Sequence, residues 1–410
     1  MIFNEKIHSF DKFIKNWKPE DTYALYGASK DCVLLIESLD IILNNNKLKI
    51  SCIIDDFIPN GTTFENIYKL NDSSYKPDNF LKANERKNLK VISFEQFQKD
   101  SKISKDKIII TSDVNYNKTK NFLIEKKYEE NVDFCNYKKI AAIWPFKLEN
   151  KTHLWRSDLL LTEKCTLSCT YCNMFMPHYK NPKHRDIDEI KNDFDLYFEK
   201  VDFVSVFHLV GGEPLMYPKI DEVLEYIGSK YRNKIGRLLL STNGSLVPKQ
   251  STFDLFKKYY LLIYISNYTN AIKYGRRFNQ FVDQLVQNNI VHLVRNNIEW
   301  SDFGDPNKIR FHGEKEIIDH FDKCTAPYKG LNQGKYYYCH LNTSAVLAGL
   351  QNLDEGDYIK IDNNLNKEEL LKFDLGYLPK GYATFCKKCN GCNTGIEEIP
   401  VSYASQGIRG

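Results

Sequence analysis

The sequence predicts an α/β protein of more than one domain, with parallel sheets and a small cysteine-rich part near the C-terminal end. Short apolar segments of strand length alternate with segments whose apolar residues recur at helical spacing, which is typical of parallel sheets. The 410 residues exceed the length of one typical core. Eight of the eleven cysteines lie in two groups, which favours metal or cluster ligation over a disulfide framework.

The first 145 residues contain the pattern strand, glycine turn, helix, strand and acid. Strands are predicted over residues 22–26, 50–54, 90–92 and 108–111, and helices over 32–43 and 116–127. Gly27 follows the first strand and Asp55-Asp56 ends the second, in the order of a dinucleotide-binding unit. Such a unit has three glycines at the turn, whereas this chain has only Gly27.

The N-terminal segment resembles the Rossmann-like domains attached to bacterial surface-polysaccharide and sugar-modifying enzymes. The resemblance leaves two roles open, a working nucleotide site and a degenerate module for docking or substrate capture. Asp55 and Asp56 are equally compatible with plain turn residues. Residues 137–152 lose their periodicity and contain Pro145, so they are predicted to be a linker.

A second series of strands surrounds the first cysteine group. Strands are predicted over residues 157–161, 203–210, 237–240, 259–265 and 290–294, with a helix over 187–201. Directly after the first of these strands stand Cys165, Cys169 and Cys172, with CxxxCxxC spacing. Three thiolates on one loop leave one iron of a four-iron cluster without a protein ligand. A zinc site and three buried thiols are the alternatives, although structural zinc normally takes four ligands.

The cysteine spacing, Tyr171 before the last cysteine, and the run Gly211-Gly212-Glu213-Pro214 after the next strand together resemble the radical S-adenosylmethionine (SAM) superfamily. The resemblance implies a partial (β/α)6 barrel over residues 153–320. It implies a [4Fe-4S] cluster whose open iron is chelated by SAM, and an electron that splits SAM to give a 5'-deoxyadenosyl radical. That radical would abstract hydrogen from a substrate.

The resemblance also implies cofactor-binding residues at the ends of successive strands. Gly211, Gly212, Glu213 and Pro214 match the segment that contacts the amino group of SAM. Ser241, Asn243 and Ser266 follow or end the next strands, where side chains can bond the ribose and carboxylate of SAM. Helix capping is the alternative role for each of these three residues. No catalytic acid or base is singled out.

The second group contains Cys324, Cys339, Cys386, Cys389 and Cys392. Gly334 predicts a hairpin turn that returns Cys339 toward Cys324. The pattern resembles the twitch and SPASM auxiliary-cluster domains of the same superfamily, over residues 321–410. It implies one auxiliary [4Fe-4S] cluster held by the first four of these cysteines, with Cys392 as an alternative ligand or a spare thiol. A structural zinc ribbon is the alternative.

The substrate expected from the N-terminal resemblance is a sugar or nucleotide-linked sugar, oxidised or epimerised during surface-polysaccharide assembly. The alternatives are maturation of a ribosomally made peptide and a non-enzymatic zinc or cluster protein. A flavodoxin- or ferredoxin-type reductant is expected. The net charge of +4 predicts no nucleic-acid partner. Without a signal peptide or an apolar run of membrane-spanning length, the chain is expected to be cytoplasmic.

Overall fold

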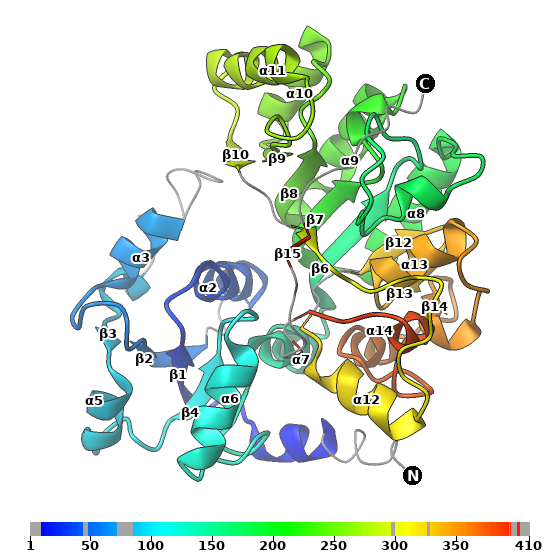
Figure 1. Ribbon diagram of the computed structural model, residues 1–410. Coiled ribbons are helices and arrows are strands. Elements are labelled where there is room, and N and C mark those ends of the chain that lie inside the picture. Colours follow the sequence, from blue (N-terminus) through cyan, green and yellow to red (C-terminus); the bar gives the residue numbers. More distant parts are fainter. Residues whose placement is uncertain are drawn as a thin grey trace. The chain divides into compact units, whose positions relative to one another are not determined.

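The computed structural model describes residues 10–43, 48–71, 85–296, 300–325, 329–392, 394 and 400–401. The chain divides into two compact units, unit 1 from Met1 to Trp155 and unit 2 from Arg156 to Gly410 (Figure 1). Both predicted cysteine groups therefore belong to unit 2.

Unit 1 is built on five parallel strands in the order β3-β2-β1-β4-β5. These strands are β1 (Thr22–Tyr26), β2 (Lys49–Ile54), β3 (Val91–Ile92), β4 (Lys107–Ile110) and β5 (Phe134–Asn136). Its helices include α2 (Lys30–Leu43), α3 (Phe64–Asn71), α5 (Phe94–Lys99), α6 (Tyr116–Glu125) and α7 (Tyr137–Glu149). In doubly wound sheets of this order the direction of winding reverses beside β1, where such folds bind their ligands. The predicted strand at 22–26 is confirmed.

Two apolar layers cover the sheet of unit 1. Helices α5 and α6 pack Phe94, Phe97 and Leu123 against one face of the strands. Helix α2 packs against α7, and the buried rings of Trp17, Tyr23 and Trp144 form an aromatic group. Both layers are apolar because parallel strands are buried on both faces.

Asp55 and Asp56 both stabilise turns at the carboxyl ends of the strands. Asp55 accepts hydrogen bonds from the backbone N–H groups of Ala28 and Phe57, each at 2.9 Å. Asp56 accepts from the N–H of Phe94 at 2.8 Å and from the hydroxyl of Tyr26 at 2.9 Å. The sequence left open whether these carboxylates bind a nucleotide or are plain turn residues. The contacts observed here are those of turn residues.

The predicted linker is wrong, because residues 137–149 form helix α7. Asn136 caps its start by accepting from the N–H of Lys138, and Asn150 ends it in the left-handed conformation. Pro145 has no N–H to give to the carbonyl of Ala141, four residues earlier. The ring Nδ1 of His153 lies 2.6 Å from that carbonyl oxygen and satisfies it in place of the missing bond.

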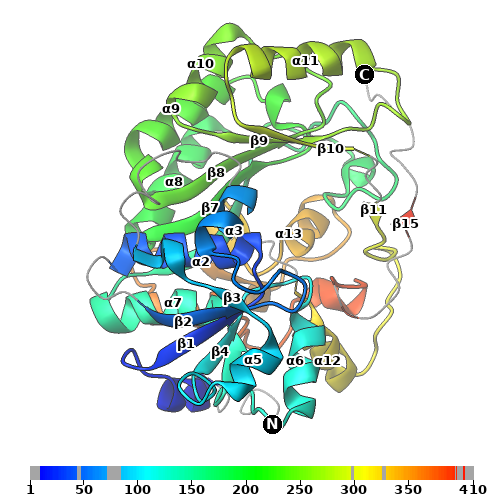
Figure 2. The same cartoon turned by 90° about the vertical axis from the view of Figure 1, so that its left-hand side faces the viewer.

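Unit 2 contains an eight-stranded sheet in the order β10-β9-β8-β7-β6-β12-β13-β14. The pairs β7–β8, β8–β9 and β9–β10 are parallel. The strands that begin this series are β6 (His153–Leu160), β7 (Phe203–Val210), β8 (Ile235–Thr242), β9 (Leu262–Ser266) and β10 (His292–Arg295). Four helices follow them along the chain, α8 (Ile187–Lys200), α9 (Ile220–Tyr231), α10 (Gln250–Lys258) and α11 (Gly275–Gln287). Helices α9, α10 and α11 lie on one side of β8, β9 and β10 (Figure 2).

The sheet continues past β6 into the C-terminal part of the chain. Strand β12 (Gly330–Asn332) is parallel to β6, and β13 (Lys335–Tyr337) and β14 (Tyr358–Lys360) add antiparallel strands. Strand β12 thus lies beside β6, the first strand of the series. A (β/α)6 barrel would instead place its sixth parallel strand next to β10, the fifth strand of the series. The predicted hairpin is confirmed, because Gln333 and Gly334 both have positive φ between β12 and β13.

The remaining elements are helices α12 (Glu314–Lys323), α13 (His340–Leu347) and α14 (Lys367–Asp374), and the short pair β11 (Trp300–Ser301) and β15 (Pro400–Val401). Among the described residues, no helix is both long enough and apolar enough to cross a bilayer.

Candidate functional site

The first cysteine group lies on the loop that follows β6. Cys169 is buried, and Cys165 and Cys172 are half-buried. Cys165 and Cys172 each contact two apolar groups, one that contains Leu160 and one that contains Tyr268. The thiols therefore lie between two apolar walls. Burial raises the pKa of all three thiols, that of Cys169 to about 12, so binding iron would release their protons.

The two glycines after β7 lie against this loop. The N–H of Gly212 donates to the carbonyl of Thr162 at 2.8 Å, and the N–H of Glu213 donates to that of Lys164 at 2.9 Å. A Cβ at Gly211 would lie 2.7 Å from the Thr162 oxygen, and one at Gly212 would lie 2.3 Å from the Lys164 oxygen. Glycine is therefore required at both positions because the segment after β7 lies directly against the segment that precedes the cysteines. This requirement is separate from any role in leaving room for a ligand.

Glu213 joins the ends of β7 and β8. Its carboxylate is fully buried and accepts from the N–H of Leu215 at 3.0 Å and from the N–H of Asn243 at 2.8 Å. Burial raises the pKa of Glu213 to about 7. Glu213, which the sequence predicts to contact the cofactor, therefore holds the ends of β7 and β8 together.

Asn243 is brought to the cysteine loop. Its Nδ2 donates to the hydroxyl of Thr166 at 2.9 Å and lies 3.8 Å from the Sγ of Cys165. Its Oδ1 accepts from the N–H of Ser245, whose hydroxyl lies 2.6 Å from that of Thr166. The sequence missed Thr166 and Ser245, because nothing in their spacing shows that these two loops meet.

Ser241 belongs to a different polar group, which the sequence also missed. Its hydroxyl lies 2.7 Å from Nε2 of His208, and Nδ1 of His208 lies 2.6 Å from Arg156. Because a guanidinium only donates, Nδ1 of His208 accepts and its proton is on Nε2. Asp158 accepts from Arg156 at 2.8 Å and from Nδ1 of His340 at 3.2 Å. These side chains come from β6, β7, β8 and α13.

The other predicted cofactor residues lie at strand ends. Ser266 is the last residue of β9 and hydrogen-bonds Tyr268, whose ring packs beside Cys169. Pro214 is buried at the start of a short helix after Glu213. Tyr274, which the sequence did not single out, donates to the carbonyl of Asn243 at 2.8 Å.

The second cysteine group gathers residues from three segments of unit 2. Cys324 ends α12, Cys339 caps α13, and Cys386 and Cys389 lie in and after a short helix over Thr384–Lys387. Burial raises the pKa of the Cys386 thiol, and the neighbouring thiols of Cys389, Cys324 and Cys339 raise it further. The N–H of Cys392 lies 3.4 Å from the Sγ of Cys324, so all five predicted cysteines are brought together.

The two cysteine groups share an apolar wall. Phe175, three residues after Cys172, packs its ring 5.3 Å from that of Phe385, beside Cys389. Helix α13 runs along this wall, and the hydroxyl of Ser344 lies 3.6 Å from the sulfur of Met174.

The donor set at both sites consists of thiols. Within the part of the chain that the structure describes, no three Cys, His, Asp or Glu side chains converge tightly enough to hold one metal ion. Iron–sulfur clusters distribute thiolates over several irons, whereas tetrahedral zinc gathers its ligands around one ion. Both iron–sulfur clusters and structural zinc take cysteine thiolates, so the donor set is compatible with either group.

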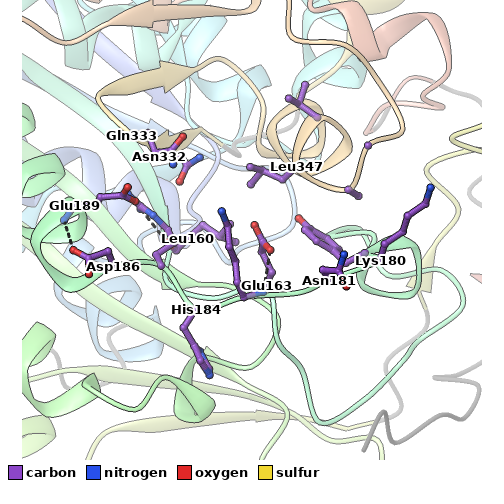
Figure 3. Close-up of a pocket in the computed structure, with 16 residues that line it drawn as sticks. Leu160, Glu163, Lys180, Asn181, His184, Asp186, Glu189, Asn332, Gln333 and Leu347 are labelled. Carbon is purple, nitrogen blue, oxygen red and sulfur yellow. Dashed lines mark hydrogen bonds between the residues drawn. The ribbon is translucent and has the colours of Figure 1, made fainter.

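A pocket of about 870 Å³ opens beside the first cysteine loop (Figure 3). It is lined by the end of β6, by residues 179–186, by the turn between β12 and β13, and by the end of α13. Figure 3 shows Asn332 and Gln333 on one side and Lys180 and Asn181 on the other, with Glu163 between them.

Comparison with known proteins identifies one family. Residues 159–270 match the model of the Radical SAM superfamily. Over 102 residues, the chain is 28% identical to the antilisterial bacteriocin subtilosin biosynthesis protein AlbA of Bacillus subtilis (strain 168). That match covers 24% of this chain and 20% of AlbA, so the chain spans about one fifth of the length of this curated relative.

Three solved structures are also similar to parts of the chain. Streptococcus suis SuiB bound to S-adenosylmethionine has 17% identity and a TM-score of 0.29, over 37% of this chain and 34% of SuiB. The protein anSMEcpe with bound AdoMet has 12% identity and a TM-score of 0.40, over 61% and 92% of the two chains. BtrN in complex with AdoMet and 2-DOIA has 15% identity and a TM-score of 0.38, over 58% and 94%.

The family match extends from the end of β6 past β9 and includes the cysteine triplet and the Gly211–Pro214 run. Residues 159–270 of this chain therefore form a Radical SAM superfamily domain.

Proposed function

We propose that the protein is an enzyme that reductively cleaves S-adenosylmethionine and abstracts hydrogen from a substrate. The observation that carries the proposal is the loop after β6, which presents Cys165, Cys169 and Cys172 within the matched family region. A [4Fe-4S] cluster bound there would supply the electron that converts SAM into a 5'-deoxyadenosyl radical. Gly211–Pro214, Asn243, Ser241 and Ser266 are proposed to position the cofactor.

The chain's own residues fit these roles in different ways. The N–H of Leu167 lies 3.4 Å from the sulfur of Cys165, and Nδ2 of Asn243 lies 3.8 Å from the same sulfur. Donors of this kind stabilise the thiolate that ligates iron. The apolar walls around the loop exclude water from a site where a radical must not be quenched.

We further propose that Cys324, Cys339, Cys386 and Cys389 hold an auxiliary [4Fe-4S] cluster in a twitch-like domain. Full ligation by protein would limit such a cluster to passing electrons. The wall formed by Phe175, Phe385 and α13 would place its thiols near those of the first loop.

Two substrate classes are carried forward, and a specific observation favours each. The strand order of unit 1 supports the sugar or nucleotide-linked sugar expected from the sequence. The local similarity to AlbA, a bacteriocin biosynthesis protein, favours a ribosomally made peptide. Oxidation and epimerisation both remain compatible with hydrogen abstraction.

The test is anaerobic incubation of the reconstituted protein with SAM and dithionite, followed by quantification of 5'-deoxyadenosine. We expect the wild type to form it and a variant with Cys165, Cys169 and Cys172 all replaced by Ala to form none. A Cys52→Ala variant is the control, because Cys52 lies in β2 of unit 1. Equal cleavage by the triple variant, or a wild type that binds zinc and no iron, would refute the proposal.

A further inference from the structure

The polar group around Ser241 fixes the direction of its hydrogen bonds. Nδ1 of His208 lies 2.6 Å from a terminal nitrogen of Arg156, which can only donate. Burial lowers the pKa of His208, so the ring is neutral and carries one N–H. That proton is on Nε2, which lies 2.7 Å from the hydroxyl oxygen of Ser241. Because this oxygen accepts from His208, the hydroxyl hydrogen of Ser241 points elsewhere.

Arg156 is itself held by a buried carboxylate. Asp158 is 1% exposed, and its Oδ1 accepts from Nε of Arg156 at 2.8 Å. The same Oδ1 lies 3.6 Å from Nδ1 of His208, beyond hydrogen-bond distance, so Arg156 is the partner of that nitrogen. Nδ1 of His340 lies 3.2 Å from the other carboxylate oxygen. Asp158 therefore fixes the guanidinium, and the guanidinium fixes the tautomer of His208.

The hydroxyl of Ser241 lies on the more open face of the sheet. Within the described part of the chain, its side chain bonds His208 and its hydrogen meets no acceptor. Ser241 is half-buried, whereas its neighbours Leu240 and Thr242 in β8 are buried. In the register of β8 and β9, Ser241 pairs with Tyr264, which is also half-buried. Because side chains alternate along a strand, these two share one face, and a ligand on that face can accept from Ser241.

This end of the sheet is also where the first cysteine loop lies. Asn243, two residues beyond Ser241, places its Nδ2 3.8 Å from the sulfur of Cys165. Ser266 ends β9 two residues after Tyr264 and so belongs to the same face. Ligands of parallel sheets bind at the carboxyl ends of the strands. Ser241 is thus placed to meet a ligand that is bound beside the cysteine loop.

We propose that His208 is a positioning residue for the cofactor: by donating to Ser241, it directs the Ser241 hydroxyl to donate to an oxygen of S-adenosylmethionine. The inference rests on the proposed function in taking S-adenosylmethionine as the ligand of Ser241. It adds which part of the cofactor meets this side chain. A carboxylate or ribose oxygen can accept from Ser241, whereas the ammonium group only donates.

The test measures the affinity of the anaerobically reconstituted protein for S-adenosylmethionine by equilibrium dialysis without a reductant. Ser241→Ala should bind about five- to tenfold more weakly, the effect of one lost hydrogen bond. His208→Asn should show the same loss, because its oxygen can accept from Arg156 but its amide is too short to reach Ser241. His208→Gln should bind like the wild type, because its longer amide supplies both the acceptor and the donor.

A double variant separates positioning from a general structural role. If His208 acts through Ser241, adding His208→Asn to Ser241→Ala should weaken binding no further, whereas independent contributions would multiply. His208→Phe fills the space of the ring without a donor and should repeat the result of His208→Asn. The matched control is His292→Asn in β10 of the same sheet. Since Leu293 pairs with Tyr264, His292 points to the opposite face, and this variant should bind like the wild type.

Iron content and melting temperature are measured for every variant, so that loss of the cluster or of the fold is seen directly. Wild-type affinity in Ser241→Ala or in His208→Asn, multiplied losses in the double variant, or no binding by the wild type would overturn the inference. Formation of 5'-deoxyadenosine after addition of dithionite is measured in the same preparations. A wild type that binds S-adenosylmethionine with the expected variant effects, yet does not cleave it, would refute the proposed function alone.

Discussion

At the scale of single residues, close contact between main-chain segments explains the glycine pair. The φ of Gly212 does not lie in the left-handed region, so glycine is needed at this position because a side chain would have no room. The position that a Cβ would take lies 2.3 Å from the Lys164 oxygen and 2.8 Å from the sulfur of Met176. Backbone atoms cannot turn aside as a flexible side chain does, so any larger residue must push the cysteine loop.

We predict that Gly212→Ala destabilises unit 2 by about 1–3 kcal/mol, the usual cost of overpacking, and lowers the iron retained by the cysteine triplet. Urea unfolding and iron analysis measure the two effects. Gly275→Ala is the control, because a Cβ there meets nothing within 4 Å. It starts α11, where alanine is the better helix former. A Gly212→Ala variant as stable and as iron-rich as the control would contradict the role assigned to this contact.

The site residues that could be identified from the sequence are those that lie close together within one short segment of the chain. The spacing of Cys165, Cys169 and Cys172 is visible along the chain. The group formed by Arg156, Asp158 and His340 is not visible, because more than 180 positions of sequence separate its ends and only strand register and the placement of α13 join them. Residues of ordinary type that meet through tertiary structure carry no local signal.

At the scale of secondary structure elements, α7 shows why a proline misleads sequence-based assignment. Proline in a helix interior removes a hydrogen bond and costs about 3 kcal/mol. The apolar side chains of Ile140, Ile143 and Trp144 are buried and offset that cost. His153 takes the orphaned carbonyl of Ala141. Neither compensation is visible in the local pattern, which shows only the break.

This compensation predicts a dependence of stability on pH. Burial lowers the pKa of His153 from 6.5 to about 4, so the folded state favours the neutral ring. Between these values the unfolded chain binds a proton that the folded chain does not. The stability that His153 contributes is therefore complete above pH 6.5 and is lost as the pH falls toward 4. The loss from pH 8 to pH 5 is about 2 kcal/mol.

His153→Gln should remove this part of the pH dependence, since the amide can still donate to Ala141 and does not titrate. Urea unfolding followed by tryptophan fluorescence reports on unit 1, where Trp17, Trp144 and Trp155 lie. His312→Gln changes an exposed histidine of unit 2 and is the control. The same loss between pH 8 and pH 5 in wild type and His153→Gln would show that another group is responsible.

At the scale of the whole molecule, alternation along the chain predicted two parallel sheets, and nearly all predicted strands overlap observed ones. The boundary and the continuity of the second sheet were not predictable in the same way. Strand β12 pairs with β6 across about 170 positions, which joins the cysteine-rich part to the same sheet as the first cysteine loop. Pairing partners of this kind are decided by which exposed edge remains, and local periodicity does not contain that information.

The two cysteine groups of unit 2 lie on different segments of the chain, which predicts two separable cluster sites. We expect the anaerobically reconstituted wild type to contain about eight irons per chain, four for each [4Fe-4S] cluster. Replacing Cys324 and Cys386 by Ala should reduce this to about four, while 5'-deoxyadenosine still forms, because the first loop keeps its three thiols. Iron and sulfide analysis and the cleavage assay measure both.

Cys392→Ala is the matched variant within the same group. Its backbone lies beside Cys324, yet four other thiols suffice for a cluster, so we expect it to keep about eight irons. Four irons in Cys392→Ala would instead make Cys392 a ligand. Eight irons in the Cys324 and Cys386 double variant, or zinc in place of the second set of four, would remove the auxiliary cluster and leave the second cysteine group a structural site.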